Sequence, residues 1–284
     1  MMSSCWQVIF SPKENVSDEF TEFLEDFFEV SAQNYDDDGN DEYIGYCTVF
    51  DETEMLKQSS HFQLPPYKAE KLESSNWLKD YVIRFAPFET DKFLIYGIHE
   101  SHTPQTDKIP LQIYAATAFG SDHHTTRSCL KAICDLHNQG FAPSKILDIG
   151  TGSGILSLAA ASLWPNAEII AVDIDDEAVL VTKTNAENNH LDSHIQIAQS
   201  NGYQSSLVTD NSPYDLILAN ILARPLLDMS NDTVTHLSSK GYAILSGFVD
   251  EQEQWVINAH QQLGLKLSEL YKSENWRTAL MQKE

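Results

Sequence analysis

Three glycines at alternate positions, Gly150, Gly152 and Gly154, separate a short apolar run from an Ala/Leu-rich run in the segment KILDIGTGSGILSLAA. Residues without a Cβ allow the backbone to approach a bound ligand closely. The apolar run before the glycines is typical of a buried strand, and the run after them is typical of a helix. The segment therefore predicts a strand, a turn that contacts a ligand, and a helix.

An acidic residue, Asp173, ends a second apolar run about twenty residues after these glycines. An acid at the end of the second strand of a βαβ unit can accept hydrogen bonds from two ribose hydroxyls. The glycines and Asp173 together predict a nucleoside site. The alternative without a ligand is a glycine-rich turn in some other α/β protein.

Asp148, which lies two residues before the first glycine, distinguishes between kinds of nucleoside. Dinucleotide folds favour the spacing G-x-G-x-x-G, which sets a pyrophosphate at a helix N-terminus. The spacing here is D-x-G-x-G-x-G, and a carboxylate would repel a pyrophosphate but could bind the ammonium of an amino acid, directly or through water. We therefore expect S-adenosylmethionine, which has that ammonium and no phosphate, and keep an NAD site as the alternative.

A polar residue, Asn220, ends another buried run, in the segment YDLILANILARPL. Ligands of open α/β sheets bind at the carboxyl ends of the strands, so we expect Asn220 to face the substrate. A side-chain oxygen there could hold an amine nitrogen and aim its lone pair at a methyl group. The alternative is that Asn220 caps a helix expected at 224–237.

The segment TAFGSDHHTTRSCL, residues 117–130, contains a glycine turn, two adjacent histidines and a Thr-Thr pair. Because it precedes the first strand of the βαβ unit, it could fold over the cofactor as a lid. Adjacent histidines point in different directions and no third ligand follows at a suitable spacing, so we expect no metal at His123 and His124. Thr125 and Thr126 could each be a helix cap or a cofactor contact.

The elements that must position these residues follow from the periodicity of the chain after residue 93. Strands and helices alternate, which predicts a mainly parallel sheet. Two closing strands without a helix between them imply one antiparallel strand, so we expect the seven-stranded methyltransferase sheet of the Rossmann-like α/β class. The expected strands are 93–96, 145–149, 168–172, 195–198, 214–219, 242–246, 266–271 and 276–281, and the expected helices are 125–138, 155–163, 177–188, 224–237 and 251–263.

Residues 1–74 are expected to form a small α+β module of the ferredoxin-like kind that contains no catalytic constellation. A stripe of phenylalanines at helical spacing is expected to form its core. Residues 75–92 are expected to be a linker with a connecting helix, and residues 93–284 the methyltransferase domain. Within the module we expect strands at 6–10 and 43–50, helices at 18–30 and 66–74, and a solvated hairpin tip at 36–42.

The chain is strongly acidic, with 42 acidic against 18 basic residues and a net charge of −24. This charge disfavours direct nucleic-acid binding and favours basic partners, although solubility alone would also explain it. No apolar run is long enough to span a membrane and the first residues lack signal-peptide features, so we expect a cytoplasmic protein without membrane contact. The four cysteines form no C-x-x-C pair, which fits free thiols and no structural zinc.

Three motifs in fixed order, AFGSDHHTTRSCL, LDIGTGSGILSLAA with VDID, and NILA, resemble those of the ribosomal protein L11 methyltransferases, the PrmA family. The resemblance extends to LSGFVDEQ and ENWRTALMQ near the end of the chain. It implies an S-adenosylmethionine-dependent enzyme that methylates lysine ε-amines and an N-terminal α-amine of a basic substrate, ribosomal protein L11, which the N-terminal domain recognises. The family's binding positions match Thr126, Gly150, Asp173 and Asn220.

The reaction expected from these residues is in-line transfer of the sulfonium methyl group to a neutral amine, which leaves S-adenosylhomocysteine. Asn220 is the catalytic candidate and also a cofactor contact, beside Thr126, Asp148 and the three glycines of the loop. Two other interpretations stay open: a methyltransferase of another protein or a small amine, and a non-catalytic protein that binds the cofactor and a partner.

Overall fold

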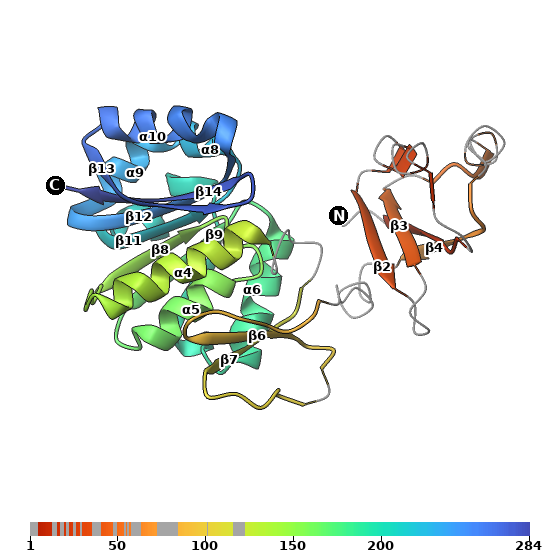
Figure 1. Ribbon diagram of the computed structural model, residues 1–284, viewed down its shortest axis with the longest axis horizontal. Coiled ribbons are helices and arrows are strands. Elements are labelled where there is room, and N and C mark those ends of the chain that lie inside the picture. Colours follow the sequence, from red (N-terminus) through yellow and green to blue (C-terminus); the bar gives the residue numbers. More distant parts are fainter. Residues whose placement is uncertain are drawn as a thin grey trace. The chain divides into compact units, whose positions relative to one another are not determined.

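The computed structural model divides into two compact units, Met1–Ile83 and Arg84–Glu284, both drawn in Figure 1. The predicted domain boundaries at 74 and 93 stay predictions. Residues 75–84 of the predicted linker lie outside the described residues, and its described part, residues 85–92, contains the short strand Phe88–Glu89 and no helix. The structure describes residues 5–12, 16–17, 20, 23–24, 27–28, 30–35, 41–47, 50–53, 55, 57 and 64–72 of the first unit, and residues 85–100, 102–115 and 123–284 of the second.

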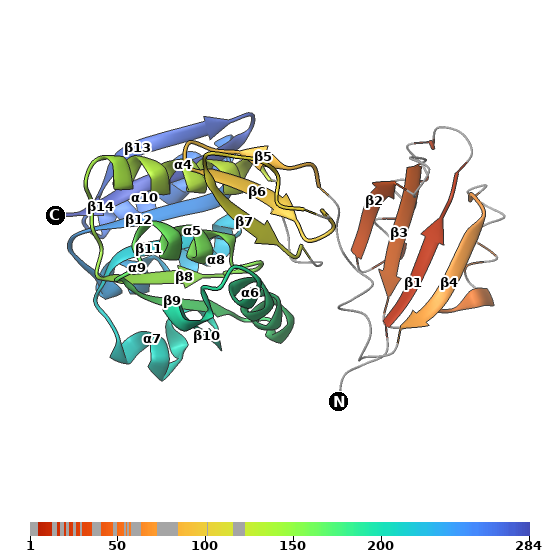
Figure 2. The same ribbon diagram turned by 90° about the horizontal axis from the view of Figure 1, so that it is seen from below.

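Four antiparallel strands form the sheet of the N-terminal unit in the order β2-β3-β1-β4. Figure 2 shows them side by side. The first and third strands are central and the second and fourth are at the edges, which is the strand order of the ferredoxin-like fold. The strands are β1 (Cys5–Phe10), β2 (Val30–Tyr35), β3 (Asp41–Cys47) and β4 (Tyr67–Leu72).

The core of the N-terminal unit is aromatic. Phe10 of β1 is fully buried and meets the rings of Phe20, Phe23 and Phe28 at centroid distances of 5.3, 6.3 and 5.9 Å, each close to edge-on. Edge-to-face packing of this kind is favourable because the positive edge of one ring meets the negative face of another. The prediction that the phenylalanine stripe forms a core is confirmed.

The predicted helix at 66–74 is wrong, because Tyr67–Leu72 forms strand β4. Lys, Ala and Glu in this segment favour helix, but β1 offers an edge along which all six residues pair, and tertiary pairing overrides a weak local preference. The burial pattern has a period of two, with Tyr67 and Ala69 packed on the core and Lys68 and Glu70 exposed. Strand β2, which pairs with β3, was also not predicted.

The C-terminal unit is built on a seven-stranded sheet with the order β10-β9-β8-β11-β12-β14-β13. Neighbouring strands from β10 to β12 are parallel, and β14 is antiparallel to both β12 and β13. The predicted sheet with one antiparallel strand is confirmed. The strands are β8 (Lys145–Ile149), β9 (Glu168–Asp173), β10 (Ile195–Gln199), β11 (Tyr214–Asn220), β12 (Leu237–Val249), β13 (Leu265–Ser273) and β14 (Trp276–Lys283).

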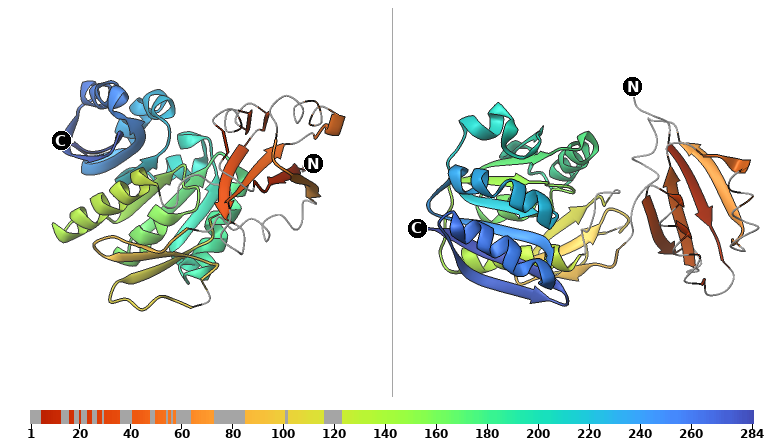
Figure 3. Two further views of the ribbon diagram at one scale, coloured as in Figure 1. Left: turned by 45° about the vertical axis from the view of Figure 1, so that its right-hand side comes forward. Right: turned by 90° about the horizontal axis from the view of Figure 1, so that it is seen from above.

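Helices cover both faces of this sheet, as Figures 1 and 3 show. Side chains of a strand point alternately to its two faces. Ile146 of β8 accordingly packs in the core beneath α4 and α5, and Leu147 packs in the opposite core beneath α8 and α10. One face carries α4 (His124–Asn138), α5 (Ile155–Leu163) and α6 (Asp176–Asn188), and the other carries α8 (Ala223–Asp228), α9 (Ser230–His236) and α10 (Glu253–Gln262).

Three parts of this unit differ from the prediction. A second, three-stranded sheet contains β5 (Phe88–Glu89), β6 (Phe93–Gly97) and β7 (Ile109–Ile113), of which only β6 was predicted. Pro110 concealed β7, because proline donates no ladder hydrogen bond and is confined to edge strands. The predicted helix at 224–237 is divided into α8 and α9, and β12 extends beyond the predicted 242–246 at both ends.

Across the described parts of both units, no helix combines the length and the apolar character that crossing a membrane requires.

Candidate active site

A cavity of about 710 Å³ opens where β8, β9 and β11 end. Parallel strands of an open α/β sheet bring their carboxyl ends to one edge, so the loops that follow them surround a common space. Five residues predicted from the sequence line this cavity: Thr126, Gly150, Gly152, Asp173 and Asn220.

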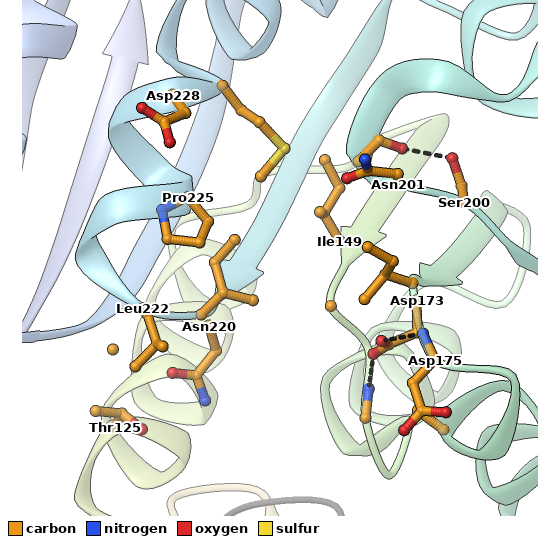
Figure 4. A pocket seen from close by; sticks show the side chains of 18 of the residues that line it. Thr125, Ile149, Asp173, Asp175, Ser200, Asn201, Asn220, Leu222, Pro225 and Asp228 are labelled. Carbon is orange, nitrogen blue, oxygen red and sulfur yellow. Dashed lines mark hydrogen bonds between the residues drawn. The ribbon is translucent and has the colours of Figure 1, made fainter.

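Both sides of the cavity combine polar and apolar side chains. Figure 4 shows Asn220 and Asp228 on one side together with Leu222 and Pro225, and Asp173 and Asp175 with Ile149 on the other side. The described residues that line the cavity include the carboxylates of Asp173, Asp175 and Asp228 but no lysine or arginine. The cavity therefore favours a ligand with positive charge over one with a phosphate group.

The glycine loop lies against the end of β9. The backbone N–H groups of Gly150 and Thr151 both donate to the carbonyl of Val172, at 2.9 and 3.1 Å. Gly150 has a φ of +68°, and a Cβ there would lie 2.3 Å from Cγ2 of Ile221. The absence of a Cβ at Gly150 thus allows the loop after β8 to pack against the loop after β11, and its predicted approach to a ligand stays a prediction.

Asp173 connects the glycine loop to the start of α6. Its Oδ2 accepts a hydrogen bond from the N–H of Gly152 at 2.9 Å, and its Oδ1 accepts one from the N–H of Asp175 at 3.1 Å. A carboxylate can accept about four hydrogen bonds, so both oxygens can still accept donors from a ligand in the cavity. This capacity is what a ribose diol requires.

Asp148 and Gly154 do not line the cavity. Asp148 is 1% exposed, and its Oδ2 accepts hydrogen bonds from the hydroxyls of Thr151 and Ser157, at 2.8 and 2.6 Å. Burial raises the pKa of Asp148 to about 6, although these two hydrogen bonds act in the opposite direction. The predicted contact of Asp148 with a cofactor ammonium stays a prediction. In this structure its carboxylate binds the glycine loop through the hydroxyl of Thr151.

Asn220 and Thr126 are in direct contact. The side-chain amide of Asn220 donates to the hydroxyl of Thr126 at 3.2 Å. This contact brings the end of β11 to the first turn of α4, and it engages Nδ2 of Asn220 and not Oδ1. The structure thus places together two residues that the sequence had assigned to one site.

The two capping alternatives are wrong. The N-cap of α4 is His123, whose ring accepts the N–H of Thr125, so neither Thr125 nor Thr126 is the cap. The N-cap of α8 is Leu222, which makes no side-chain bond, so Asn220 does not cap that helix.

His123 and His124 have different surroundings. Burial and the neighbouring His124 lower the pKa of His123, which lines the cavity and packs edge-on against Trp276 at 4.6 Å. His124 bonds to the hydroxyl of Ser273 through Nδ1 and lies 3.6 Å from a carboxylate oxygen of Glu274 through Nε2. The described residues contain no cluster of ligands suited to a metal ion. The first six residues of the predicted lid, residues 117–122, lie outside the described residues.

The family model for Ribosomal protein L11 methyltransferase (PrmA) matches residues 12–284. The chain belongs to the PrmA family. A protein named Ribosomal protein L11 methyltransferase from Rhodopseudomonas palustris is 34% identical to this chain over 215 residues, which cover 75% of this chain and 72% of that protein. A protein of the same name from Brucella suis is 33% identical to this chain over 256 residues, which cover 89% of each. The crystal structure of ribosomal protein L11 methylase from Lactobacillus delbrueckii subsp. bulgaricus covers 69% of this chain and 96% of that one at 28% identity, with a TM-score of 0.57.

Membership of the PrmA family confirms the resemblance drawn from the three sequence motifs. The chain is a methyltransferase and its cofactor is S-adenosylmethionine. The predicted fold class is likewise confirmed, because the seven-stranded sheet has a methylase of the family as a structural neighbour.

Gly247 of this PrmA chain was missed from the sequence. It has a φ of +96°, and a Cβ there would lie 2.1 Å from the carbonyl oxygen of Ile221. The N–H of Ile221 in turn donates to the carbonyl of Ser246 at 3.0 Å, which fixes the loop after Asn220 to β12. The glycine in the SGF segment was the available signal, but its meaning depends on β11 and β12 being neighbours.

Two apolar side chains at the cavity were also missed. Leu222, which follows Asn220 closely, is 70% exposed, and Ile174, which follows Asp173, is 64% exposed. Large apolar side chains that are this exposed to solvent beside a cavity are typical of ligand-binding surfaces. Ile174 directly follows Asp173, and Leu222 follows Asn220 by two residues, so their closeness in sequence to predicted polar residues was the signal that could have identified them.

Proposed function

We propose that this chain transfers methyl groups from S-adenosylmethionine to amines of ribosomal protein L11, on lysine ε-amines and the N-terminal α-amine. The contact between Asn220 and Thr126 carries the proposal, because it sets a polar amide at the cavity wall opposite Asp173. The names of the relatives support L11 as the substrate. A cytoplasmic location, where ribosomal proteins are made, is part of the proposal.

The residues of the cavity fit S-adenosylmethionine. The carboxylate of Asp173 retains acceptor capacity for ribose hydroxyls, and the exposed side chain of Ile174 offers apolar surface to a flat base. The cofactor carries a sulfonium and an ammonium but no phosphate, which agrees with a lining that contains carboxylates and, among its described residues, no lysine or arginine. When bound, the cofactor supplies an electrophilic methyl group.

Asn220 is proposed to orient the amine. Because its Nδ2 donates to Thr126, its Oδ1 is available to accept an N–H from the substrate amine. An amine held in this way keeps its lone pair in a fixed direction, and fixed geometry is the main source of acceleration in a displacement of this kind.

The amine must lose a proton before it reacts. For a lysine with an ordinary pKa, this costs about 4 to 5 kcal/mol at pH 7. His123 is a poor base for this step: its Nδ1 accepts the N–H of Thr125, so the neutral ring carries its proton on Nε2. Desolvation beside the cationic cofactor lowers the amine's pKa, and we propose that the proton leaves to water before the site closes around the amine.

The charge of the chain supports a basic substrate. The net charge is −24, and Asp173, Asp175 and Asp228 line the cavity. A negative surface attracts a lysine-rich protein and accelerates encounter at low salt.

The test is transfer of an isotope-labelled methyl group to a mixture of purified ribosomal proteins. Label on L11 alone supports the proposal. Label on another protein or on a small amine would indicate a different substrate class, and binding of the cofactor without transfer to any of them would indicate a non-catalytic protein.

A further inference from the structure

Helix α6 holds the glycine loop by its carbonyl groups. The hydroxyl of Thr182 donates to the carbonyl of Gly152 at 2.9 Å, and the amide of Asn185 donates to the carbonyl of Ser153 at 2.8 Å. Thr182 and Asn185 are three residues apart, so they lie on the same face of the helix. Both side chains are fully buried, although both residues are polar.

Asn185 uses both of its amide N–H donors and accepts one hydrogen bond through its Oδ1. Its Oδ1 accepts the N–H of Tyr114 at 2.7 Å, and its Nδ2 donates both to the carbonyl of Tyr114, at 3.0 Å, and to that of Ser153. The backbone partners settle the orientation of the amide, because an N–H can only donate and a carbonyl can only accept. One side chain thus connects the segment after β7 to the glycine loop.

A second asparagine on the same helix provides a comparison. Asn189 accepts the N–H of Gln112 at 2.9 Å and donates to the carbonyl of Gln112 at 2.7 Å. It therefore binds the edge of β7 in the same manner as Asn185, but it makes no contact with the glycine loop. Asn189 is only partly buried and also donates to the carbonyl of Asn185 at 2.8 Å, so it serves as a comparison for the loss of an asparagine contact with β7.

The loop needs these contacts because its own backbone is unusually free. Gly150, Gly152 and Gly154 all have positive φ values, and glycine has more accessible conformations than any other residue. The peptide group is planar, so fixing the carbonyls of Gly152 and Ser153 also fixes the N–H groups of the residues that follow them. The N–H of Gly152 is held separately by Asp173.

We infer that Thr182 and Asn185 are positioning residues for the cofactor, which hold the glycine loop in its binding conformation through the carbonyls of Gly152 and Ser153. This inference rests on the proposed contact of the glycine loop with S-adenosylmethionine. Neither residue lines the cavity, so both act through the loop.

Four variants test the inference. Thr182→Val keeps the shape of the side chain and removes its donor, and Thr182→Ser keeps the donor. Asn185→Asp keeps the shape of the side chain. Its carboxyl group has no donor when ionised and only one when protonated, so at least one of the carbonyls of Tyr114 and Ser153 loses its hydrogen bond. Asn189→Asp makes the same change where the glycine loop is not contacted. S-adenosylhomocysteine binding is measured by calorimetry, the thermal midpoint by circular dichroism, and turnover at saturating cofactor with ribosomal protein L11.

We expect Thr182→Val and Asn185→Asp each to raise the Kd for S-adenosylhomocysteine about tenfold, as for a buried carbonyl left without a donor. Thr182→Ser and Asn189→Asp should have a Kd within about twofold of the wild-type value. Asn189→Asp should nevertheless lower the thermal midpoint, as Asn185→Asp does, because it also loses a hydrogen bond to β7. Turnover at saturating cofactor should fall by less than about threefold, because the loop does not touch the reacting amine.

Unchanged affinity in Thr182→Val and Asn185→Asp would overturn the inference, and so would an equal loss in Asn189→Asp. If Asn185→Asp does not fold, the Thr182→Val and Thr182→Ser pair decides alone. A wild-type chain that fails to bind S-adenosylhomocysteine would instead contradict the proposed function, so the two failures are distinguishable.

Discussion

Asn220 donates its side-chain amide to the hydroxyl of Thr126 at 3.2 Å, across 94 residues of sequence. The contact joins the end of β11 to the first turn of α4 at the cavity wall. It gives the amide a fixed orientation, and it places Thr126 of the predicted lid beside the residue proposed to orient the amine.

Replacing Asn220 with alanine should lower turnover strongly. We expect kcat to fall about a hundredfold, because the amine loses the oxygen that orients it. Any rise in the Kd for S-adenosylhomocysteine measures the predicted contact of Asn220 with the cofactor. Thr126→Val should lower kcat by about tenfold through the lost contact, and Thr126→Ser should restore it. Steady-state kinetics with saturating cofactor provide the measurement, and a wild-type kcat in Asn220→Ala would refute the assignment.

Asp173→Ala should weaken cofactor binding, because it removes the proposed acceptor for the ribose and the partner of the Gly152 N–H. We expect the Kd for S-adenosylhomocysteine to rise by about tenfold or more. Asp176→Ala is the matched control: this exposed carboxylate stands in the first turn of α6 and does not line the cavity. The control should lose about 0.5 kcal/mol of stability and little affinity. Equal affinities for Asp173→Ala and the wild type, measured by calorimetry, would be incompatible with this role.

The sequence predicted the C-terminal sheet well because its strands are buried and strongly apolar. The bounds of β8 at Lys145–Ile149 and of α5 at Ile155–Leu163 agree with the prediction to the residue. Prediction failed where pairing with another strand decides the conformation. Strand β4 contains good helix formers, and β7 contains a proline, so in both cases the partner strand and not the local preference sets the structure.

Asp148→Asn should change how stability depends on pH. Burial raises the pKa of Asp148 from 3.8 to about 6 in the folded chain. The folded state therefore holds the proton of Asp148 more tightly than the unfolded state does. As the pH rises from about 4 to about 6, the contribution of Asp148 to the free energy of unfolding decreases by at most about 3 kcal/mol. An asparagine still accepts from both hydroxyls, so the variant avoids this decrease.

The measurement is urea unfolding of wild type and Asp148→Asn between pH 4 and pH 7. The difference in free energy should move in favour of the variant up to about pH 6 and then stay constant. A difference independent of pH would contradict the raised pKa. The same variant tests the predicted ammonium contact: a large loss of cofactor affinity would support it, and wild-type affinity would limit Asp148 to support of the loop.

Gly247→Ala should be far more damaging than Gly140→Ala. Both glycines have positive φ values, so each alanine carries a backbone strain of about 1 to 2 kcal/mol. A Cβ at Gly140 would meet nothing within 4 Å, whereas one at Gly247 would meet the backbone of Ile221. Because Ile221 follows Asn220, Gly247→Ala should also lower kcat by about tenfold or more. Similar thermal midpoints and kcat values for the two variants would exclude this role of Gly247.

The site could be predicted only as far as each residue belongs to a local pattern. Gly150, Asp173 and Asn220 each end a strand-like run, and that pattern indicated their position. The approach of Gly247 to Ile221 depends on β11 and β12 being neighbours in the sheet. The hydrogen bonds of Asn185 to Tyr114 and to the glycine loop depend on the packing of α6 against the end of β7. Contacts between elements leave no periodic signal in the sequence.

The central claim is tested most directly by the intact mass of ribosomal protein L11 after incubation with this chain and S-adenosylmethionine. We predict mass gains in steps of one methyl group, which are absent or strongly reduced with Asn220→Ala. An unchanged mass of L11, under conditions where the wild-type chain binds S-adenosylhomocysteine, would contradict the account.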